Sequence, residues 1–143
     1  TMRSVLYTLQ RLKEQEKKQK QRELAQAQQT REEKHQYVQQ LTDELAQERK
    51  YFPKTAGELA LQDRSLVNQY YALCRSEEEL DVHTENVQVC QEALLFARQQ
   101  SKINETLIES MEAEIALERK RKQDKESDEL GVMGWWRNQR FLD

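Results

Sequence analysis

A single stretch, Tyr51-Phe52-Pro53-Lys54-Thr55-Ala56-Gly57, interrupts an otherwise long run of helix-forming residues. It holds the only proline of the 143-residue chain and one of its three glycines. Proline lacks the N–H that a helix interior needs, and it disfavours helical geometry in the preceding residue. Thr55 and Glu58 then have the spacing of a capping box, which begins a new helix. The stretch therefore predicts a first helix that ends, a short turn, and a second helix that returns.

The composition favours long helices over a broad globular core. Hydrophobic residues make up 36% of the chain and charged residues 34%, whereas a globular domain has about 45–50% apolar residues. Disorder is the competing interpretation of so polar a chain. Leucines that recur in steps of three and four argue against disorder and for a coiled coil. We therefore predict an all-α fold, a single long antiparallel coiled-coil hairpin of two helices over residues 1–143.

The apolar spacing also predicts where each element lies and which residues pack in the seam. The predicted elements are a first helix over about 4–51, a turn over 52–55, a second helix over about 56–129 and a tail over 130–143. The expected seam residues of the first helix are Val5, Leu9, Leu12, Leu24, Ala27, Val38, Leu41 and Leu45. Those of the second helix, with small slips of register, are Leu59, Leu66, Tyr70, Leu73, Leu80, Val87, Cys90, Leu94 and Ala97.

The position of the turn predicts which parts of the helices face each other. Because both helices rise about 1.5 Å per residue, folding at Pro53 and Lys54 places opposite each other residues whose numbers sum to about 107. The basic N-terminal arm, residues 3–22, then faces the acidic segment 77–92, and the opposite charges favour that pairing. With this pairing, the N-terminal end of the first helix lies opposite about residue 103 of the second helix. The longer second helix is therefore expected to overhang, with apolar residues that have no partner within the hairpin.

The sequence contains no recognisable motif for catalysis, metal binding or cofactor binding. The two histidines, His35 and His83, do not have the spacing of metal ligands. Neither a glycine-rich phosphate loop nor a nucleophile motif occurs. The carboxylates of residues 77–81 would need a pocket to act as an acid or base, and a two-helix hairpin offers none. We therefore expect no catalytic, metal-binding or cofactor-binding residues and no enzyme activity.

Two common classes of partner are not expected. The basic run Lys13–Glu23 contains no aromatic residue that could stack on a base, and Glu14, Glu16 and Glu23 interrupt its charge. This composition predicts no nucleic-acid binding. No apolar run approaches the roughly 20 residues that a membrane-spanning helix needs. We therefore also expect no direct insertion into a membrane.

The C-terminal tail is a candidate docking segment. Gly131 and Gly134 are expected to break the second helix shortly before Trp135 and Trp136. Tryptophans are costly to leave in water, and tryptophan and arginine are enriched in binding hot spots. The residues expected to dock are Asp128, Glu129, Leu130, Trp135, Trp136 and Arg137.

Three features of the chain match the pattern of a known family. One is Val5-Leu6-Tyr7-Thr8-Leu9-Gln10-Arg11-Leu12-Lys13, which leads into a polar helix. Another is the short turn about a third of the way along, followed by a longer helix. The last is the charged run Gln123–Gly131, with Asp-Glu and an apolar residue near its end. Together they resemble the FliJ/YscO-type coiled-coil proteins of bacterial type III export systems, flagellar or injectisome. Trp135 and Trp136 have no counterpart in that pattern.

The resemblance implies a non-enzymatic central stalk in the bacterial cytoplasm, peripheral to the secretion apparatus at the inner membrane. Such proteins bind and stimulate the hexameric export ATPase, and they contact the export gate and substrate chaperones. Carried over to this chain, the ATPase-binding residues are Leu6, Leu9, Leu12, Ile108, Met111 and Ile115. The residues left free for another partner at the tip of the hairpin are Tyr51, Phe52, Pro53 and Lys54. The protein is expected to be monomeric when alone.

A second interpretation needs no ATPase. In it the chain is a structural coiled-coil scaffold that self-associates through its overhanging C-terminal helix. It predicts a dimer whose population depends on concentration, and no effect on ATP turnover.

Overall fold

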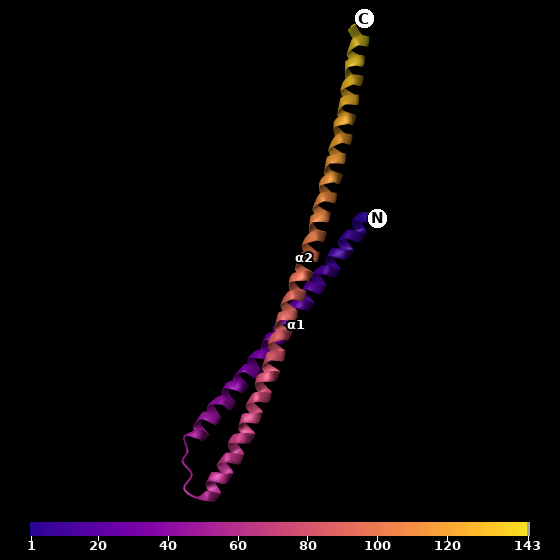
Figure 1. The fold of residues 1–143 in the computed structure, drawn as a ribbon. Coiled ribbons are helices and arrows are strands. Elements are labelled where there is room, and N and C mark those ends of the chain that lie inside the picture. Colours follow the sequence, from indigo (N-terminus) through magenta and orange to yellow (C-terminus); the bar gives the residue numbers. More distant parts are fainter. Residues whose placement is uncertain (143) are drawn as a thin grey trace. The chain divides into compact units, whose positions relative to one another are not determined.

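The protein is an all-α hairpin of two helices, as predicted. The computed structural model describes residues 1–142, with side chains for residues 1–140. Helix α1 spans Met2–Arg49 and helix α2 spans Ala56–Leu142, with 48 and 87 residues respectively (Figure 1). Within the described residues there is no strand.

The chain divides into two compact units, and both helices contribute to each. Unit 1 consists of Thr1–Glu14 and Gln100–Asp143, and unit 2 consists of Gln15–Gln99. In each unit a segment of α1 packs antiparallel against a segment of α2. In unit 2 this is shown by Lys34, which pairs with Glu79, while Arg31, earlier in α1, bonds Thr84, later in α2.

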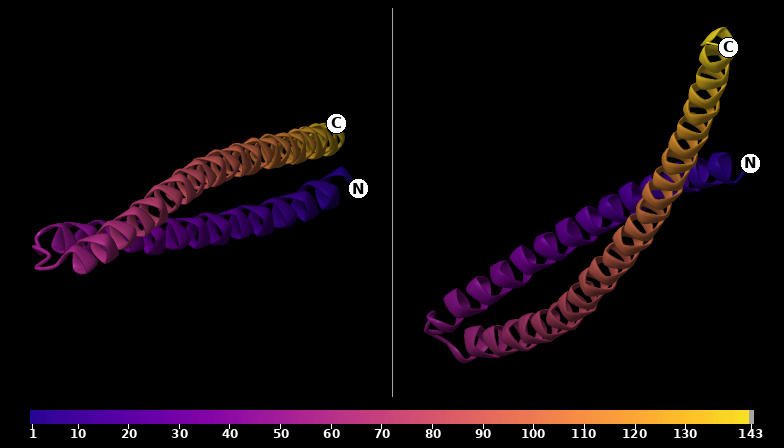
Figure 2. Two further views of the ribbon diagram at one scale, coloured as in Figure 1. Left: turned by 60° about the horizontal axis from the view of Figure 1, so that its bottom comes forward. Right: turned by 90° about the horizontal axis from the view of Figure 1, so that it is seen from above.

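The connection between the helices, residues 50–55, belongs to unit 2 (Figure 2). It carries the cap that the sequence predicts. The Thr55 hydroxyl accepts a hydrogen bond from the Glu58 N–H at 3.1 Å. The Glu58 carboxylate reaches back and accepts one from the Lys54 N–H at 2.8 Å. The first bond satisfies a donor in the first turn of α2 that no helical carbonyl can reach, and the second satisfies the Lys54 N–H of the connection.

The register of the seam differs from the prediction. In unit 2 the numbers of facing residues sum to 113 for Lys34 with Glu79 and 115 for Arg31 with Thr84, and not to about 107. The cause lies in the connection, which runs alongside the first turns of α2. Gln62, almost two turns into α2, donates hydrogen bonds to the carbonyl of Glu48 in the last turn of α1 and to the carbonyl of Tyr51 in the connection.

The altered register changes the charge pairing. The acidic segment 77–92 faces Arg31 and Lys34, not the basic N-terminal arm as expected. The Lys34 ammonium lowers the pKa of the Glu79 carboxyl, first by hydrogen bonding and then by its charge. Both side chains are partly exposed, so this pair adds little to stability and mainly supports the register.

A small hydrophobic cluster of unit 2 lies toward the connection. Val38, Leu45 and Leu73 are buried, and Leu41, Leu66 and Leu80 pack against them half-buried. Farther along the seam the buried side chains include small ones, such as Ala27 and Ala97. Val87 and Leu94, farther from the connection, are buried as well, so hydrophobic stabilisation is spread along the seam of unit 2.

The seam of α2 is a regular heptad pattern, without the predicted slips of register. Residues that are buried or half-buried recur in alternating steps of four and three along α2 in unit 2. They are Gln62, Leu66, Gln69, Leu73, Ser76, Leu80, His83, Val87, Cys90, Leu94 and Ala97. Leu59 and Tyr70, expected in the seam, are instead exposed. The predicted slips arose because polar residues such as Gln69 occupy seam positions and apolar neighbours lie beside them.

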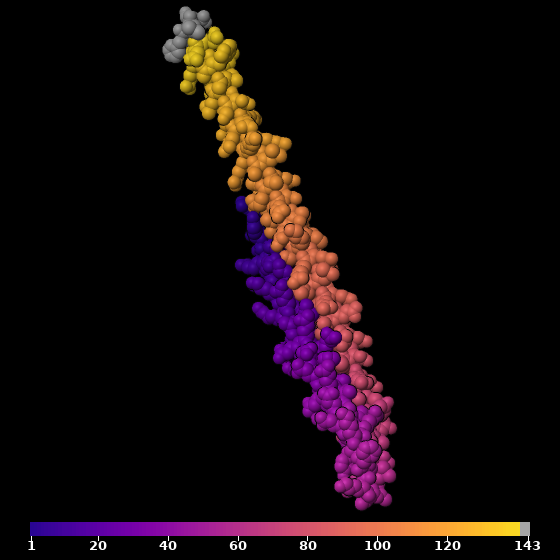
Figure 3. Space-filling view, turned by 90° about the vertical axis from the view of Figure 1, so that its left-hand side faces the viewer, coloured from indigo at the N-terminus to yellow at the C-terminus, as the bar shows by residue number. Residues whose placement is uncertain are grey.

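In unit 1 the first helix reaches farther along α2 than predicted. Arg3 forms an ion pair with Glu112 at 2.9 Å, so α1 runs out near residue 112 and not near residue 103. Beyond that point the side chains of residues 116–133 and 135–140 are exposed. The space-filling view shows this part of α2 without cover from α1 on the visible face (Figure 3). The predicted overhang is therefore present but shorter.

The expected end of the second helix near residue 129 does not occur, since α2 continues to Leu142. Gly131 and Gly134 have no positive φ, and a Cβ built on either would meet no atom within 4 Å. A glycine in a helix interior costs only about 1 kcal/mol relative to alanine. The neighbouring helix formers offset that cost, and the segment 130–142 is helical.

This observation leads to a prediction for the double variant Gly131→Ala and Gly134→Ala. Each replacement is expected to stabilise the end of α2 by about 0.8–1 kcal/mol, because the added methyl groups are unhindered. Trypsin cleavage at Arg137 should become several-fold slower, while the global unfolding transition stays unchanged. Faster cleavage, or a loss of helical signal by circular dichroism, would show that these glycines are needed in a non-helical state.

Candidate interaction surfaces

The structure does not place the six predicted ATPase-binding residues on one surface. Four of them lie half-buried in the seam of unit 1: Leu6, Ile108, Met111 and Ile115. Leu9 and Leu12 are exposed beside the seam, at 37% and 54%. The first four therefore hold α1 against α2, and only the last two are free to contact a partner.

Leu9 and Leu12 belong to an apolar surface that involves both helices of unit 1. Each lies one residue before a seam position of α1, and Ile103 and Leu107 each lie one residue before a seam position of α2. In an antiparallel pair, the residues that precede the seam in both helices project to the same side of it. The exposed residues of this surface, the apolar flank, are Met2, Val5, Leu9, Leu12, Ile103 and Leu107.

The opposite side of unit 1 is polar. Tyr7 and Glu112 each follow a seam position, and the Tyr7 hydroxyl donates a hydrogen bond to the Glu112 carboxylate at 3.0 Å. Arg3 pairs with the same carboxylate. Unit 1 is therefore two-faced, with hydrogen-bonded groups on one side and the apolar flank on the other. The sequence prediction missed this flank because it assigned Val5, Leu9 and Leu12 to the seam.

Between these two sides, the seam of unit 1 contains buried polar residues as well as apolar ones. Asn104 is 2% exposed, and its amide donates to the Gln10 side-chain oxygen at 2.8 Å and to the Leu6 carbonyl at 3.2 Å. The Ser101 hydroxyl donates to the Glu14 carboxylate at 2.8 Å. Within residues 1–142, the Asn104 Oδ1 atom has no hydrogen-bond partner. A buried asparagine of this kind specifies register at a cost in stability.

The predicted tip residues lie together in the connection and are open to contact. Phe52 is 86% exposed and Tyr51 55%, Lys54 is exposed, and Pro53 is half-buried. An exposed phenylalanine flanked by a tyrosine is an unusually apolar tip. Whether a partner binds there stays a prediction.

The predicted docking residues near the C-terminus lie on an exposed helical segment and not on an unstructured tail. Asp128, Glu129, Leu130, Trp135, Trp136 and Arg137 are all exposed. The two tryptophan rings lie edge to face, with their centroids 5.3 Å apart. Trp136 also lines a shallow hollow of about 230 Å³ with Met133, Arg137 and Arg140. Because the segment is helical, these side chains have defined positions on its surface before any partner binds.

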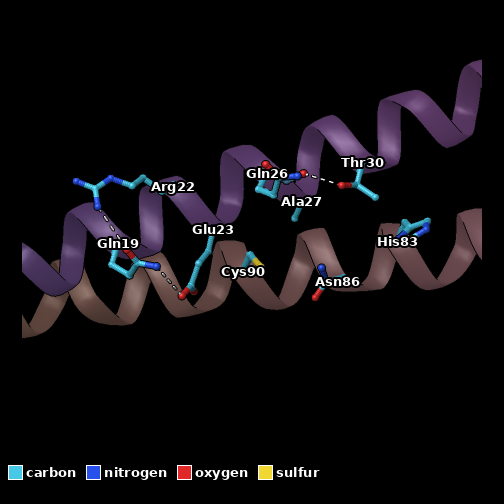
Figure 4. Close-up of a pocket in the computed structure, with 9 residues that line it drawn as sticks. All are labelled: Gln19, Arg22, Glu23, Gln26, Ala27, Thr30, His83, Asn86 and Cys90. Atoms are coloured by element: carbon cyan, nitrogen blue, oxygen red, sulfur yellow. Dashed lines mark hydrogen bonds between the residues drawn. The ribbon is translucent and has the colours of Figure 1, made fainter.

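A groove lies between α1 and α2 in unit 2 (Figure 4). Its volume is about 630 Å³, and it lies where two small side chains, Ala27 and Cys90, line the seam. Its lining residues are Gln19, Arg22, Glu23, Gln26, Ala27, Thr30, His83, Asn86 and Cys90. Cys90 is a free thiol. In residues 1–142 no group of three His, Cys, Asp or Glu side chains is arranged to hold a metal ion.

Comparisons with protein-family models, with curated proteins and with solved structures found no match. Neither helix, over the part of the chain that the structure describes, has a segment long and apolar enough to cross a membrane. The surfaces described above are therefore the basis for any assignment of function.

Proposed function

We propose that this protein is a non-enzymatic stalk component of a bacterial type III export apparatus, similar to the FliJ/YscO-type proteins. In this role it binds and stimulates the hexameric export ATPase in the cytoplasm, beside the inner membrane. The two-helix hairpin and the longer second helix support the proposal, because a stalk must be long, helical and able to enter a ring.

The observation that carries the proposal is the apolar flank of unit 1. Six exposed apolar side chains from two helices gather on one side, while hydrogen-bonded groups occupy the other. Scattered apolar residues on a surface need no explanation, but a contiguous apolar surface favours a binding partner. In the proposed complex, Val5, Leu9 and Leu12 contact the ATPase together with Ile103 and Leu107. The exposed segment around Trp135 and Trp136, and the tip, remain for the export gate or a substrate chaperone.

The alternative, a scaffold that self-associates through the overhang, has less support. The seam positions of α2 continue into the overhang at the same alternating steps. The first four there are charged, Glu118, Lys122, Lys125 and Glu129, and the next two are Val132 and Trp136. Charged residues at four successive seam positions oppose a coiled-coil contact between two copies.

The test is the rate of ATP hydrolysis by the type III export ATPase of the same organism, with increasing amounts of this protein. We expect saturable stimulation near one chain per hexamer. Leu9→Asp should reduce that stimulation at least tenfold, because it places a charge in the centre of the apolar flank. The control is Leu61→Asp in unit 2, a leucine outside the flank that is more exposed than Leu9 (69% against 37%), which should stimulate normally. No stimulation, or equal loss in both variants, would refute the proposal.

A further inference from the structure

A second apolar stripe runs along α2 in unit 2, apart from the seam. Val82, Val89 and Phe96 follow each other at intervals of seven residues and are 63%, 60% and 60% exposed. Half-buried Ala93 lies between the last two. A repeat of seven keeps these residues on one side of a coiled-coil helix, as in a seam. The stripe therefore has the periodicity of a helix-packing surface, yet α1 does not cover it.

The same side of α1 is acidic. Each residue of the stripe comes one position before a seam residue of α2. In an antiparallel pair, the residues that come one position before the seam of α1 project to the same side. Those residues of α1 are Glu16, Gln19, Glu23, Gln26, Thr30 and Glu33. The row holds three carboxylates and no basic side chain. Lys20, at a seam position, forms an ion pair with Glu23 at 3.3 Å. Arg22, which also lines the groove, donates a hydrogen bond to the side-chain oxygen of Gln19.

The groove of Figure 4 lies on this side of unit 2, although no residue of the stripe lines it. Four members of the row line it, and so does Asn86, which lies between Val82 and Val89 on α2. The small side chains of Ala27 and Cys90 leave the space, about 630 Å³. Apolar side chains of a third helix could enter there while its backbone lies along the stripe.

We propose that this side of unit 2 binds a cationic amphipathic helix from another protein. A helix is the occupant because the stripe repeats every seven residues, which matches another helix in a coiled-coil contact. It is cationic along one edge because Glu16 and Glu33 project to the same side as the stripe, and an acidic helix would be repelled. From Val82 to Phe96 the stripe extends about 21 Å, which corresponds to roughly four turns of the bound helix.

The probe is a fluorescent peptide of about 18 residues, long enough for four to five helical turns, with leucines at heptad spacing and lysines along one edge. A second peptide has glutamate at every lysine position. Fluorescence anisotropy should give saturable binding of the lysine peptide at one per chain. Binding of the glutamate peptide should be at least tenfold weaker. Equal binding of the two peptides would overturn the proposal.

Two pairs of adjacent substitutions locate the site. Phe96→Glu, in the stripe, should weaken binding of the lysine peptide at least tenfold, whereas Leu95→Glu, one residue earlier and exposed on another side, should not. Glu33→Lys, in the acidic row, should weaken it threefold or more, whereas Glu32→Lys should leave it unchanged. All four positions are exposed, so the variants should keep their helical circular dichroism. Equal effects within each pair would show nonspecific attraction of a cationic peptide and would refute the site.

Sedimentation velocity provides the remaining arm of the test. If the occupant is another protein, the chain alone stays monomeric at concentrations at which the peptide binds. A dimer that Phe96→Glu dissociates would assign the stripe to a second copy of this chain and overturn the proposal. The ATPase assay with Phe96→Glu should be normal, which separates this site from the apolar flank of unit 1.

Discussion

Leu73→Ala is expected to lower the free energy of unfolding of unit 2 by about 2–4 kcal/mol, the cost of removing a buried leucine side chain. Leu73 is 9% exposed and belongs to the buried cluster with Val38 and Leu45. This cluster is small, so one cavity removes a large share of the stability, which for a domain is only about 5–15 kcal/mol. Urea denaturation followed by far-ultraviolet circular dichroism measures the change.

The matched control is Leu61→Ala on the same helix. Leu61 is 69% exposed, so the same change of side chain should alter the unfolding free energy by less than about 0.5 kcal/mol. If Leu61→Ala destabilised the protein as much as Leu73→Ala, Leu61 would not be an exposed residue outside the seam. The assignment of seam residues along α2 would then be wrong.

Asn104→Leu is expected to stabilise unit 1 by about 1–2 kcal/mol while weakening its register. The asparagine is buried at a seam position, and its Oδ1 atom is unpaired within residues 1–142, which carries a desolvation cost of about 1–3 kcal/mol. Leucine removes that cost and adds apolar contact. The bonds to Gln10 and to the Leu6 carbonyl, which hold one alignment of α1, are then lost.

Both effects can be measured on one background in which Cys74 and Cys90 are replaced by serine. Denaturation gives the stability, and disulfide formation between cysteines placed at Tyr7 and Glu112 reports the register, since these residues are hydrogen-bonded in the native alignment. With asparagine present, this pair should cross-link rapidly and almost alone. With leucine, cysteines displaced by one heptad, at Tyr7 and Glu105, should cross-link as well. A variant that is less stable and still cross-links only at the native pair would contradict the expected role of Asn104.

The binding surfaces were only partly predictable from the sequence. The exposed tip and the segment around Trp135 follow from composition, because large apolar residues stand beside turn or charged residues. The apolar flank does not, because it depends on the phase of α1. Val5, Leu9 and Leu12 step by four and three, and so do Leu6, Gln10 and Lys13. Hydrophobicity favours the first set for the seam, yet the second set faces α2.

The sequence by itself determined the class of fold. Pro53 cannot lie inside a helix, the residues around it favour helix, and Thr55 with Glu58 begins the second helix at a defined place. These are local effects of backbone geometry and hydrogen bonding within a few residues. They do not depend on what each helix packs against.

Only the tertiary structure decided the register and the faces. An extended connection shifts α1 along α2, so that Lys34 meets Glu79 and Arg3 meets Glu112. In unit 1 the hydrogen bonds of Asn104 and Ser101 hold Gln10 and Glu14 at the seam and leave the neighbouring leucines exposed. The physical reason is that steps of three and four residues can start from more than one residue of the same helix. Spacing alone is therefore compatible with several phases, that is, with several sets of residues facing the partner helix. The polar contacts between the two helices select one of these phases, and they exist only once the chain has folded.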